Sequence, residues 1–277
     1  MTGSVNTNVA AMIALQNLSQ TNRDLEEVQN RVNTGLKVAT AKDDGAAFAI
    51  AQNMRGEVAG YNAVLERLDA GRSVVDVAVN AGSRISELLT EMKKKAVAAA
   101  DPAADSNQRT AYNNDFQALV TQIGVIVKNA SFNSLNLIDG NTATLDVIAN
   151  TTGGSNNWIS IAHQDLSATG GLGIATTTAL STQTDAEAAI TAVNTAIGSA
   201  STKLGKLGVG SLSLSTHTKF VTGLVDTFKA GIGNLVDANL PEESAKLQAL
   251  QVKQQLGTQA LSIANQAPQI ILSLFRG

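Results

Sequence analysis

The apolar positions near the start of the chain recur at steps of three and four residues, which places them on one side of a helix. Leu18, Leu25 and Val32 are also seven residues apart. Gly35 follows the last periodic residue, where a helix is expected to stop. Residues 34–44 break the period. We therefore predict an amphipathic helix followed by a connector.

Two further helices are predicted after the connector. Thr40 and Asp43 have capping-box spacing for a helix that runs from about residue 45 to residue 100. This helix is expected to end before Asp101-Pro102, because the residue before a proline avoids the helical region. A third helix is predicted over residues 106–130. Its apolar residues share one side: Phe116, Leu119, Ile123, Ile126 and Val127.

The middle of the chain has a different composition. Residues 141–184 carry only two formal charges, and Thr, Gly, Ser and Asn dominate. Short apolar runs at 145–148 and 158–161 flank a Thr-Gly-Gly-Ser turn at 152–155, which predicts a β-hairpin.

Helical character returns at Thr184, which has capping-box spacing with Glu187. Glycines at 198, 205, 208 and 210 are expected to weaken this helix in its middle. Asn239-Leu240-Pro241 is a break followed by a favourable helix start, and the last segment is again periodic.

These elements indicate a mainly α fold: a long antiparallel helical bundle or coiled coil built from both chain ends, with a small central β-hairpin region. The expected organisation is a terminal helix at 1–33, a connector at 34–44, the first part of a helical rod at 45–140, a β-hairpin and loop region at 141–183, the returning part of the rod at 184–238, and a terminal helix at 239–277.

Each end of the chain is a long amphipathic helix for which the pattern predicts no neighbour inside a compact domain. Because an isolated helix is marginal in water, we expect both ends to be mobile in a single chain and ordered when other copies cover their apolar stripes. The alternative is that the two ends pair within one chain as an ordinary bundle. The residues expected to carry self-assembly are Val9, Met12, Leu15, Leu18, Leu25, Val28, Val32, Leu247, Leu250, Leu256, Leu261, Ile263, Ile270 and Leu274.

Composition excludes several classes of function. The chain has no cysteine, which excludes disulfide scaffolds, thiolate metal sites and cysteine nucleophiles. A net charge of −3 argues against nucleic acid as a main partner, because phosphate binding needs concentrated positive charge. The apolar runs are too short to span a membrane, and the ends lack the basic face of membrane-surface helices, so no membrane partner is expected. The start of the chain lacks the pattern of a cleaved secretory signal.

No group of residues forms a convincing catalytic or ligand-binding site. His163 and His217 are far apart, with no carboxylate at metal-ligand spacing. Asp43-Asp44 are expected to cap a helix and to join an ion pair between subunits. We expect Lys93-Lys94-Lys95 to face solvent, and the glycines at 170–173 to form a turn because they lack the rest of a phosphate loop. The sequence thus predicts no enzyme activity, no cofactor and no metal.

Motifs at both ends and in the rod follow the order of a known family. They are VNTN at 5–8, RVNTGLKV at 31–38, AKDDGAA at 41–47, FNSLNLIDG at 132–140, and the segment from Glu243 to Arg276. Together these segments resemble the bacterial flagellins. The resemblance implies that the terminal helices pair as a coiled coil in the inner tube of a filament. It also implies that the next helices form a rod-like outer layer, with the connectors as spokes between the layers.

The resemblance further implies a structural subunit that polymerises into the extracellular flagellar filament and serves motility. The expected partners are other copies and other flagellins, the filament cap and hook-associated proteins, and an export chaperone at the C-terminal segment. Type III export without signal cleavage is also implied. The short middle implies a thin filament with little outer decoration. The Thr/Ser-rich residues 151–182 are candidates for O-glycans, with a plain polar loop as the alternative.

Two other functions stay open at this point. A hook–filament junction protein shares the terminal design, although the match from Glu243 to Arg276 argues against it. A cytoplasmic helical signalling hairpin is the alternative from another class. It is less favoured because such a protein needs a membrane anchor, and the sequence shows no apolar segment of that length.

Overall fold

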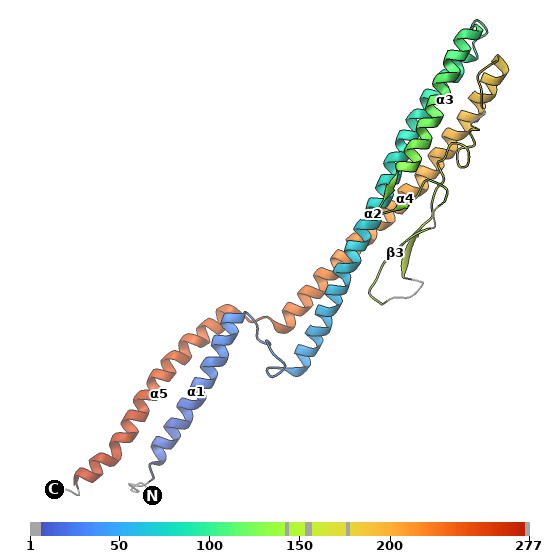
Figure 1. Cartoon of the computed structure of the whole chain (residues 1–277). Helices are drawn as coiled ribbons and strands as arrows, with labels where there is room; N and C mark the ends of the chain where they lie inside the picture. Colours follow the sequence, from blue (N-terminus) through green and yellow to red (C-terminus); the bar gives the residue numbers. More distant parts are fainter. Residues whose placement is uncertain (1–6, 142–143, 153–156, 176–177, 275–277) are drawn as a thin grey trace. The chain divides into compact units, whose positions relative to one another are not determined.

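The computed structural model describes residues 7–141, 144–152, 157–175 and 178–274, with the side chains of the last helix described as far as residue 266. Its elements are α1 (Val9–Thr34), α2 (Gly45–Ala99), α3 (Ser106–Asn129), β1 (Ser131–Phe132), β2 (Leu135–Asn136), β3 (Leu145–Ile148), β4 (Trp158–Ile161), α4 (Gln183–Val236) and α5 (Leu240–Leu274). The predicted fold class, mainly helical with small central hairpins, is confirmed (Figure 1).

The chain divides into two compact units. Unit 1 comprises residues 1–56 and 227–277, and unit 2 comprises residues 57–226, so that α2 and α4 each contribute to both. None of the helices in the described ranges combines the length and the apolar character that crossing a bilayer requires.

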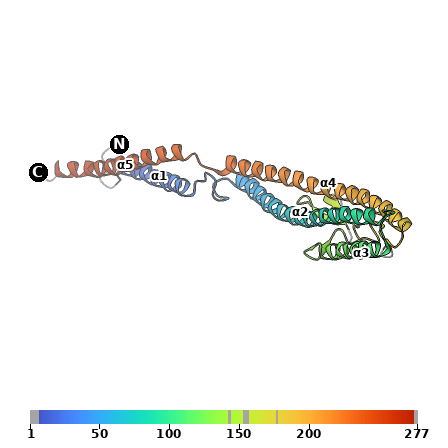
Figure 2. The ribbon, with the colours of Figure 1, turned by 90° about the horizontal axis from the view of Figure 1, so that it is seen from above.

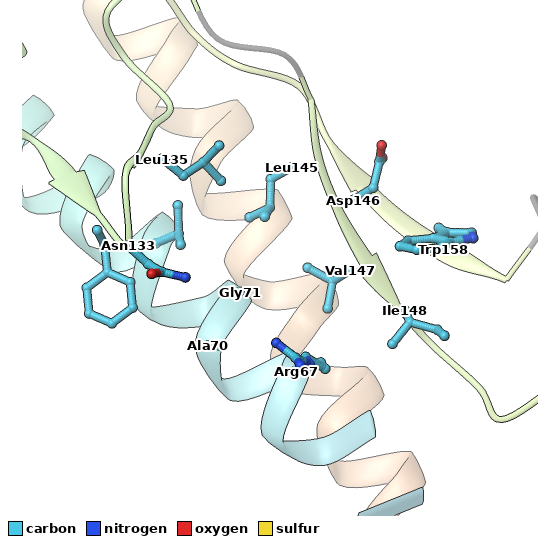
Figure 3. Close-up of a pocket in the computed structure, with 12 residues that line it drawn as sticks. Arg67, Ala70, Gly71, Asn133, Leu135, Leu145, Asp146, Val147, Ile148 and Trp158 are labelled. Atoms are coloured by element: carbon cyan, nitrogen blue, oxygen red, sulfur yellow. The ribbon is translucent and has the colours of Figure 1, made fainter. Parts of the chain in front are cut away.

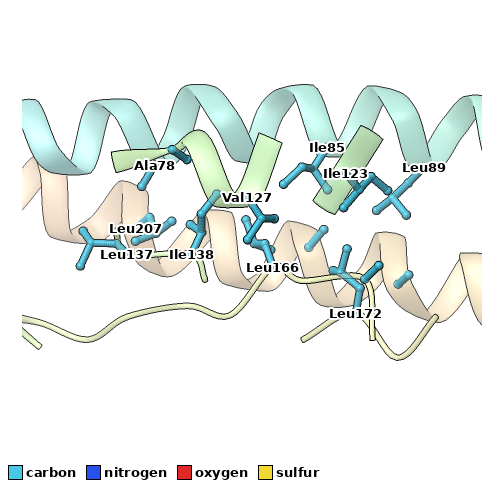
Figure 4. Packing of buried hydrophobic residues seen from close by; sticks show 14 of the residues in the cluster. Ala78, Ile85, Leu89, Ile123, Val127, Leu137, Ile138, Leu166, Leu172 and Leu207 are labelled. Atoms are coloured by element: carbon cyan, nitrogen blue, oxygen red, sulfur yellow. The ribbon is translucent and has the colours of Figure 1, made fainter. Parts of the chain in front are cut away.

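Unit 2 is built around one apolar cluster between its three helices. Side chains from α2, α3 and α4 interdigitate there with residues from the segments that connect α3 to α4 (Figure 4). The side of α3 that the periodicity predicted to be apolar faces this cluster, because Phe116, Ile123 and Val127 are buried in it. Other fully buried members are Ile85, Leu89, Leu137, Ile138, Leu166 and Leu207.

Two hairpins complete unit 2. The predicted hairpin is present: β3 and β4 pair antiparallel, with Leu145 opposite Ile161. Residues 153–156 of its predicted turn lie outside the described residues. The shorter hairpin of β1 and β2 was not predicted; its turn residues Asn133 and Ser134 have φ values of 50° and 63°. Positive φ at both central residues is the signature of a tight type I′ turn.

Glycines on α2 let the β3–β4 hairpin region approach the helix closely. A Cβ at Gly71 would lie 2.5 Å from Val147 Cγ2, and one at Gly60 would lie 2.7 Å from Thr151 Cγ2. Eleven residues beyond Gly71, Gly82 makes a similar approach to a leucine side chain of α4. Because eleven residues are close to three helical turns, these glycines lie along one side of α2.

The start of α2 is capped by Asp44, one of the two aspartates expected to cap a helix, and not by the predicted Thr40–Asp43 capping box. The side chain of Asp44 accepts hydrogen bonds from the backbone N–H groups of residues 46 and 47, at 3.0 and 2.9 Å. Asp43 instead accepts from the backbone and hydroxyl of Thr40, which closes a turn ahead of the helix. The predicted Thr40–Asp43 interaction exists, but it does not cap α2.

The start of α4 is shifted in the same way. Thr182 and Asp185 bond reciprocally at 3.1 Å and form the capping box, two residues before the predicted pair of Thr184 and Glu187. The helix then runs unbroken through the glycines that were expected to weaken it. One of them has a packing role, because a Cβ at Gly210 would meet Ile161 of β4 at 3.0 Å.

Candidate self-assembly surface

The two chain ends pair with each other in unit 1. Helices α1 and α5 lie side by side in both views (Figures 1 and 2). Asn8 Nδ2 donates to the carbonyl of Ala264 at 2.6 Å, and Arg31 Nη1 lies 3.6 Å from Glu243 Oε1, so the helices are antiparallel. The predicted coiled coil of both chain ends is therefore confirmed, and the expectation that the ends have no neighbour within the chain is wrong. The expected mobility of the ends in a single chain stays a prediction.

A heptad seam explains the pairing. On each helix one set of buried or half-buried residues recurs at alternating steps of three and four, the spacing of a coiled-coil seam. On α1 they are Ala11, Ala14, Leu18, Thr21, Leu25, Val28 and Val32. On α5 they are Glu243, Leu247, Leu250, Gln254, Gly257, Leu261 and Ala264. Gly257 admits Leu18, because a Cβ there would lie 3.2 Å from Leu18 Cδ1.

Polar groups within the seam specify its register. Gln254 Nε2 of α5 donates to Asn22 Oδ1 of α1 at 2.8 Å. The buried Thr21 hydroxyl donates to the carbonyl of Asn17 at 2.9 Å, so its burial leaves no unpaired donor. The Gln254–Asn22 bond joins the two helices, and a directional side-chain bond of this kind selects one alignment of two helices over its neighbours.

A charged group closes the end of the seam where α5 begins. The side chain of Glu243 is only 7% exposed, and its Oε1 lies 3.2 Å from Lys246 Nζ as well as near Arg31. Its Oε2 is buried without a hydrogen-bond donor among the described residues. Glu242 bonds Lys246 at 2.9 Å and raises the pKa of this ammonium, while Lys246 lowers the pKa of Glu242. The charged forms of both groups are thus favoured.

The connectors pair beside this charged end. Leu36 and Asp237 form an antiparallel bridge, and the N–H of Lys37 donates to the carbonyl of Val236 at 2.7 Å. Gly35 takes the left-handed conformation, with φ of 72°, and ends α1 as predicted. In the adjacent turn, the backbone N–H of Thr40 lowers the pKa of Asp43. The expected ion pair between subunits at Asp43-Asp44 stays a prediction.

The structure separates the predicted self-assembly residues into two groups. Seven lie in the seam: Leu18, Leu25, Val28, Val32, Leu247, Leu250 and Leu261. Five remain exposed after the helices have paired: Val9 (59%), Met12 (62%), Leu15 (57%), Leu256 (59%) and Ile263 (69%). The side chains of Ile270 and Leu274 lie outside the described residues.

Some residues of each group were not predicted from the sequence. Val252 is 55% exposed on the same side of α5 as Leu256, and it was not among the predicted residues. The small and polar seam positions, such as Ala14 and Gln254, were also missed. Extending the seven-residue spacing of Leu18, Leu25 and Val32 in steps of three and four finds all the seam residues of α1.

Unit 2 contains an apolar pocket. It has a volume of about 430 Å³ and lies between α2 and the two hairpins (Figure 3). Val147 points from β3 toward Gly71, and Arg67 and Trp158 also border the space. Apart from Arg67, Asn133 and Asp146, the lining is apolar.

The other candidate side chains of the sequence have local partners. His217 Nε2 lies 2.6 Å from the carbonyl of Ala149. Lys94 pairs with Glu91, and Lys95 with Asp115, whose hydrogen bond raises the pKa of Lys95. In the part of the chain that the structure describes, no three His, Cys, Asp or Glu side chains gather as metal ligands would.

Comparisons with known proteins agree with this architecture. Residues 5–143 match the model of the bacterial flagellin N-terminal helical region, and residues 190–275 match that of the C-terminal helical region. The chain is 47% identical over 273 residues to flagellin FljK of Caulobacter vibrioides, which covers 99% of this chain and 98% of that protein. It is 36% identical over 283 residues to a flagellin of Brucella melitensis, with 99% of each covered.

A solved structure supports the fold. The crystal structure of Bacillus cereus flagellin aligns with a TM-score of 0.50 at 19% identity, over 56% of this chain and 88% of that chain. The relatives favour the filament subunit over the junction protein and the signalling hairpin. Paired terminal helices, a helical second unit and these matches lead to one conclusion: the chain belongs to the bacterial flagellins, the non-enzymatic structural subunits of the extracellular flagellar filament.

Proposed function

We propose that the outward faces of α1 and α5 are the surfaces through which copies of this chain join in the filament. Val9, Met12, Leu15, Leu256 and Ile263 contact neighbouring copies, whereas the seam residues hold the two ends of one copy together. One observation carries this proposal: large apolar side chains stay more than half exposed on the faces that the α1–α5 seam leaves uncovered. Exposed apolar patches of this kind mark interaction surfaces.

The distribution of charge supports the same surface. No Asp, Glu, Lys or Arg occurs before Arg23 or between Lys253 and Arg276. Because Asn22 contacts Gln254 and Asn8 contacts Ala264, these two uncharged segments lie against each other. Copies can therefore bury this half of the helix pair without removing charge from water, which is the main cost of burying a polar surface.

The test replaces outward residues without touching the seam. In Leu256→Ser and Ile263→Ser the critical concentration for polymerisation should rise about tenfold each, because each loses roughly 1.4 kcal/mol of burial between copies. The melting temperature of the unassembled chain should not change, since both side chains are exposed in it. The matched control is Gln251→Ser, an exposed position of α5 away from this stripe.

Sedimentation of filaments at a series of protein concentrations measures the effect. If the critical concentration were unchanged in both Leu256→Ser and Ile263→Ser, the proposed surface would be refuted. A rise in the control as large as in the variants would show that any change on α5 disturbs assembly.

The finer organisation and the specific partners belong to the same proposal. Residues 1–33 and 239–277 form the inner tube, 34–44 the connecting spoke, and 45–140 with 184–238 the rod, with the β region at 141–183. Other flagellins, cap and hook-associated proteins contact the same outward faces at filament ends. An export chaperone covers the apolar stripe of α5 before assembly. Leu256→Ser should then weaken both chaperone binding and polymerisation. A pull-down from the native bacterium measures chaperone binding, and sedimentation measures polymerisation.

A further inference from the structure

A second exposed apolar surface lies on α4, in unit 2. Val209, Leu212 and Phe220 are 68%, 66% and 61% exposed, which makes them more exposed than most large apolar residues of the chain. With Thr216, which is also exposed, they follow helical steps of three and four. We call these four residues the α4 ridge.

The α4 ridge is turned away from the core of its own chain. The buried residues Leu207, Leu214 and Val221 are seven apart and mark the opposite side of the helix. A Cβ at Gly210 would lie 3.0 Å from Ile161 of β4, so the β3–β4 hairpin packs on the core side of the helix as well. Val209, Leu212 and Thr216 are therefore turned away from this side, while the ring of Phe220 keeps one contact in its own copy, with the ring of His217 at 5.8 Å between centroids.

The pocket between α2 and the two hairpins has the properties the ridge requires. Its lining is mostly apolar, it includes Trp158 and Phe132, which are themselves 46% and 41% exposed, and Arg67 stands at its border (Figure 3). A phenylalanine ring inserted there would meet apolar side chains on β3 and the guanidinium of Arg67, which is attracted to an aromatic face. The volume of about 430 Å³ is large enough for such a side chain.

We propose that the α4 ridge of one copy docks, with Phe220 as its anchor, into the pocket of Arg67, Val147 and Trp158 of the next copy. The two surfaces are different patches on the same unit, so each copy offers a ridge to one neighbour and a pocket to another. A contact of this heterologous kind does not close into a two-fold dimer, and it builds an open helical assembly unless its rotation closes into a ring. The proposal rests on assembly into a filament, and it adds a second contact to the terminal helices.

Cross-linking tests the contact directly, because the chain contains no cysteine. Filaments of the double variant Phe220→Cys/Trp158→Cys are treated with a short bismaleimide and dissolved in detergent. A heterologous contact predicts a ladder of dimers, trimers and longer chains. Filaments mixed from the two single variants should stop at dimers, and each single variant alone should stay monomeric.

A second double-cysteine variant tests the same contact in case the loss of Trp158 destroys the pocket. Leu212→Cys/Asp146→Cys places the sulfurs on the ridge and on an exposed pocket residue without removing the tryptophan. The matched control is Val125→Cys/Trp158→Cys, since Val125 is 51% exposed on α3. It should give no ladder.

The outcomes separate this proposal from that of the terminal helices. Filaments that form normally but give no ladder in either double variant would overturn ridge docking and leave the terminal surface intact. A ladder in the ridge variants, with normal polymerisation of Leu256→Ser and Ile263→Ser, would uphold ridge docking and refute the terminal surface. A ladder of equal strength from the Val125 control would show non-specific contact and reject the ridge.

Discussion

At the scale of single residues, Gly71 shows how close packing between a helix and a hairpin restricts which side chain a position can carry. Gly71 has no room for a side chain because Val147 of β3 lies against its Cα, and Val147 is itself 4% exposed. A valine has little rotamer freedom with which to move aside. The glycine therefore holds the hairpin on α2 and shapes one wall of the pocket.

Replacing this glycine should cost stability although alanine is the better helix former. In Gly71→Ala the clash with Val147 should lower the free energy of unfolding by about 1–3 kcal/mol, the usual cost of overpacking a core. Gly124→Ala on α3, where a Cβ meets nothing within 4 Å, should raise it by about 0.5–1 kcal/mol. Chemical denaturation of the two variants measures both values. A stabilised Gly71→Ala would contradict the close packing of the hairpin on α2.

At the scale of elements, each terminal helix has two faces with different tasks. The seam face of α1 packs against α5 within one chain, and Val28 is its most deeply buried apolar residue, at 7% exposure. Residues away from the seam, such as Val9, stay exposed. Pairing within the chain thus consumes only part of the apolar surface, which explains how a helix pair retains a surface for assembly.

Valine-to-alanine substitutions on the two faces should affect different properties, folding on one face and polymerisation on the other. Val28→Ala should lower the free energy of unfolding of unit 1 by about 2 kcal/mol, because it removes buried methyl groups. Val9→Ala should leave that free energy unchanged and should raise the critical concentration for polymerisation severalfold. Circular dichroism melts and sedimentation measure the two quantities. Equal effects of both variants on folding would show that α1 is not divided into faces.

At the scale of the whole molecule, the two units have separate apolar clusters. Unit 2 has its own large core of α2, α3, α4 and hairpin residues. Unit 1 relies on the α1–α5 seam and on a small cluster of Val38, Ala51 and Val236 beside the connectors. Separate cores let each unit keep its fold when the other changes.

Removing residues 245–277 should therefore leave the folding of unit 2 intact while it disturbs α1 and abolishes polymerisation. Unit 2 should keep its melting transition, because none of its core residues is lost. Residues of α1 should lose protection from hydrogen exchange, and the truncated chain should neither seed nor extend filaments. Hydrogen exchange and electron microscopy check these expectations. Filaments of normal length from the truncated chain would contradict the role of α5.

Much of this architecture followed from periodicity alone. The helix Ser106–Asn129, the strands of the β3–β4 hairpin and the glycine stop at Gly35 lie where the pattern placed them. Such features depend on neighbours within a few residues, which a linear pattern records. The motifs from Val5 to Arg276 also carried the family, because the whole set in order is far more specific than any one of them.

The sequence by itself determined the helices, the hairpin region and the apolar residues of the two ends. Only the tertiary structure decided which of these residues face the partner helix and which stay exposed, and which apolar side chains of unit 2 remain on its surface. The reason is geometric: the same residue spacing fits both a seam and an outer stripe, and small residues such as Ala14 or Gly257 join a seam only because of what packs against them.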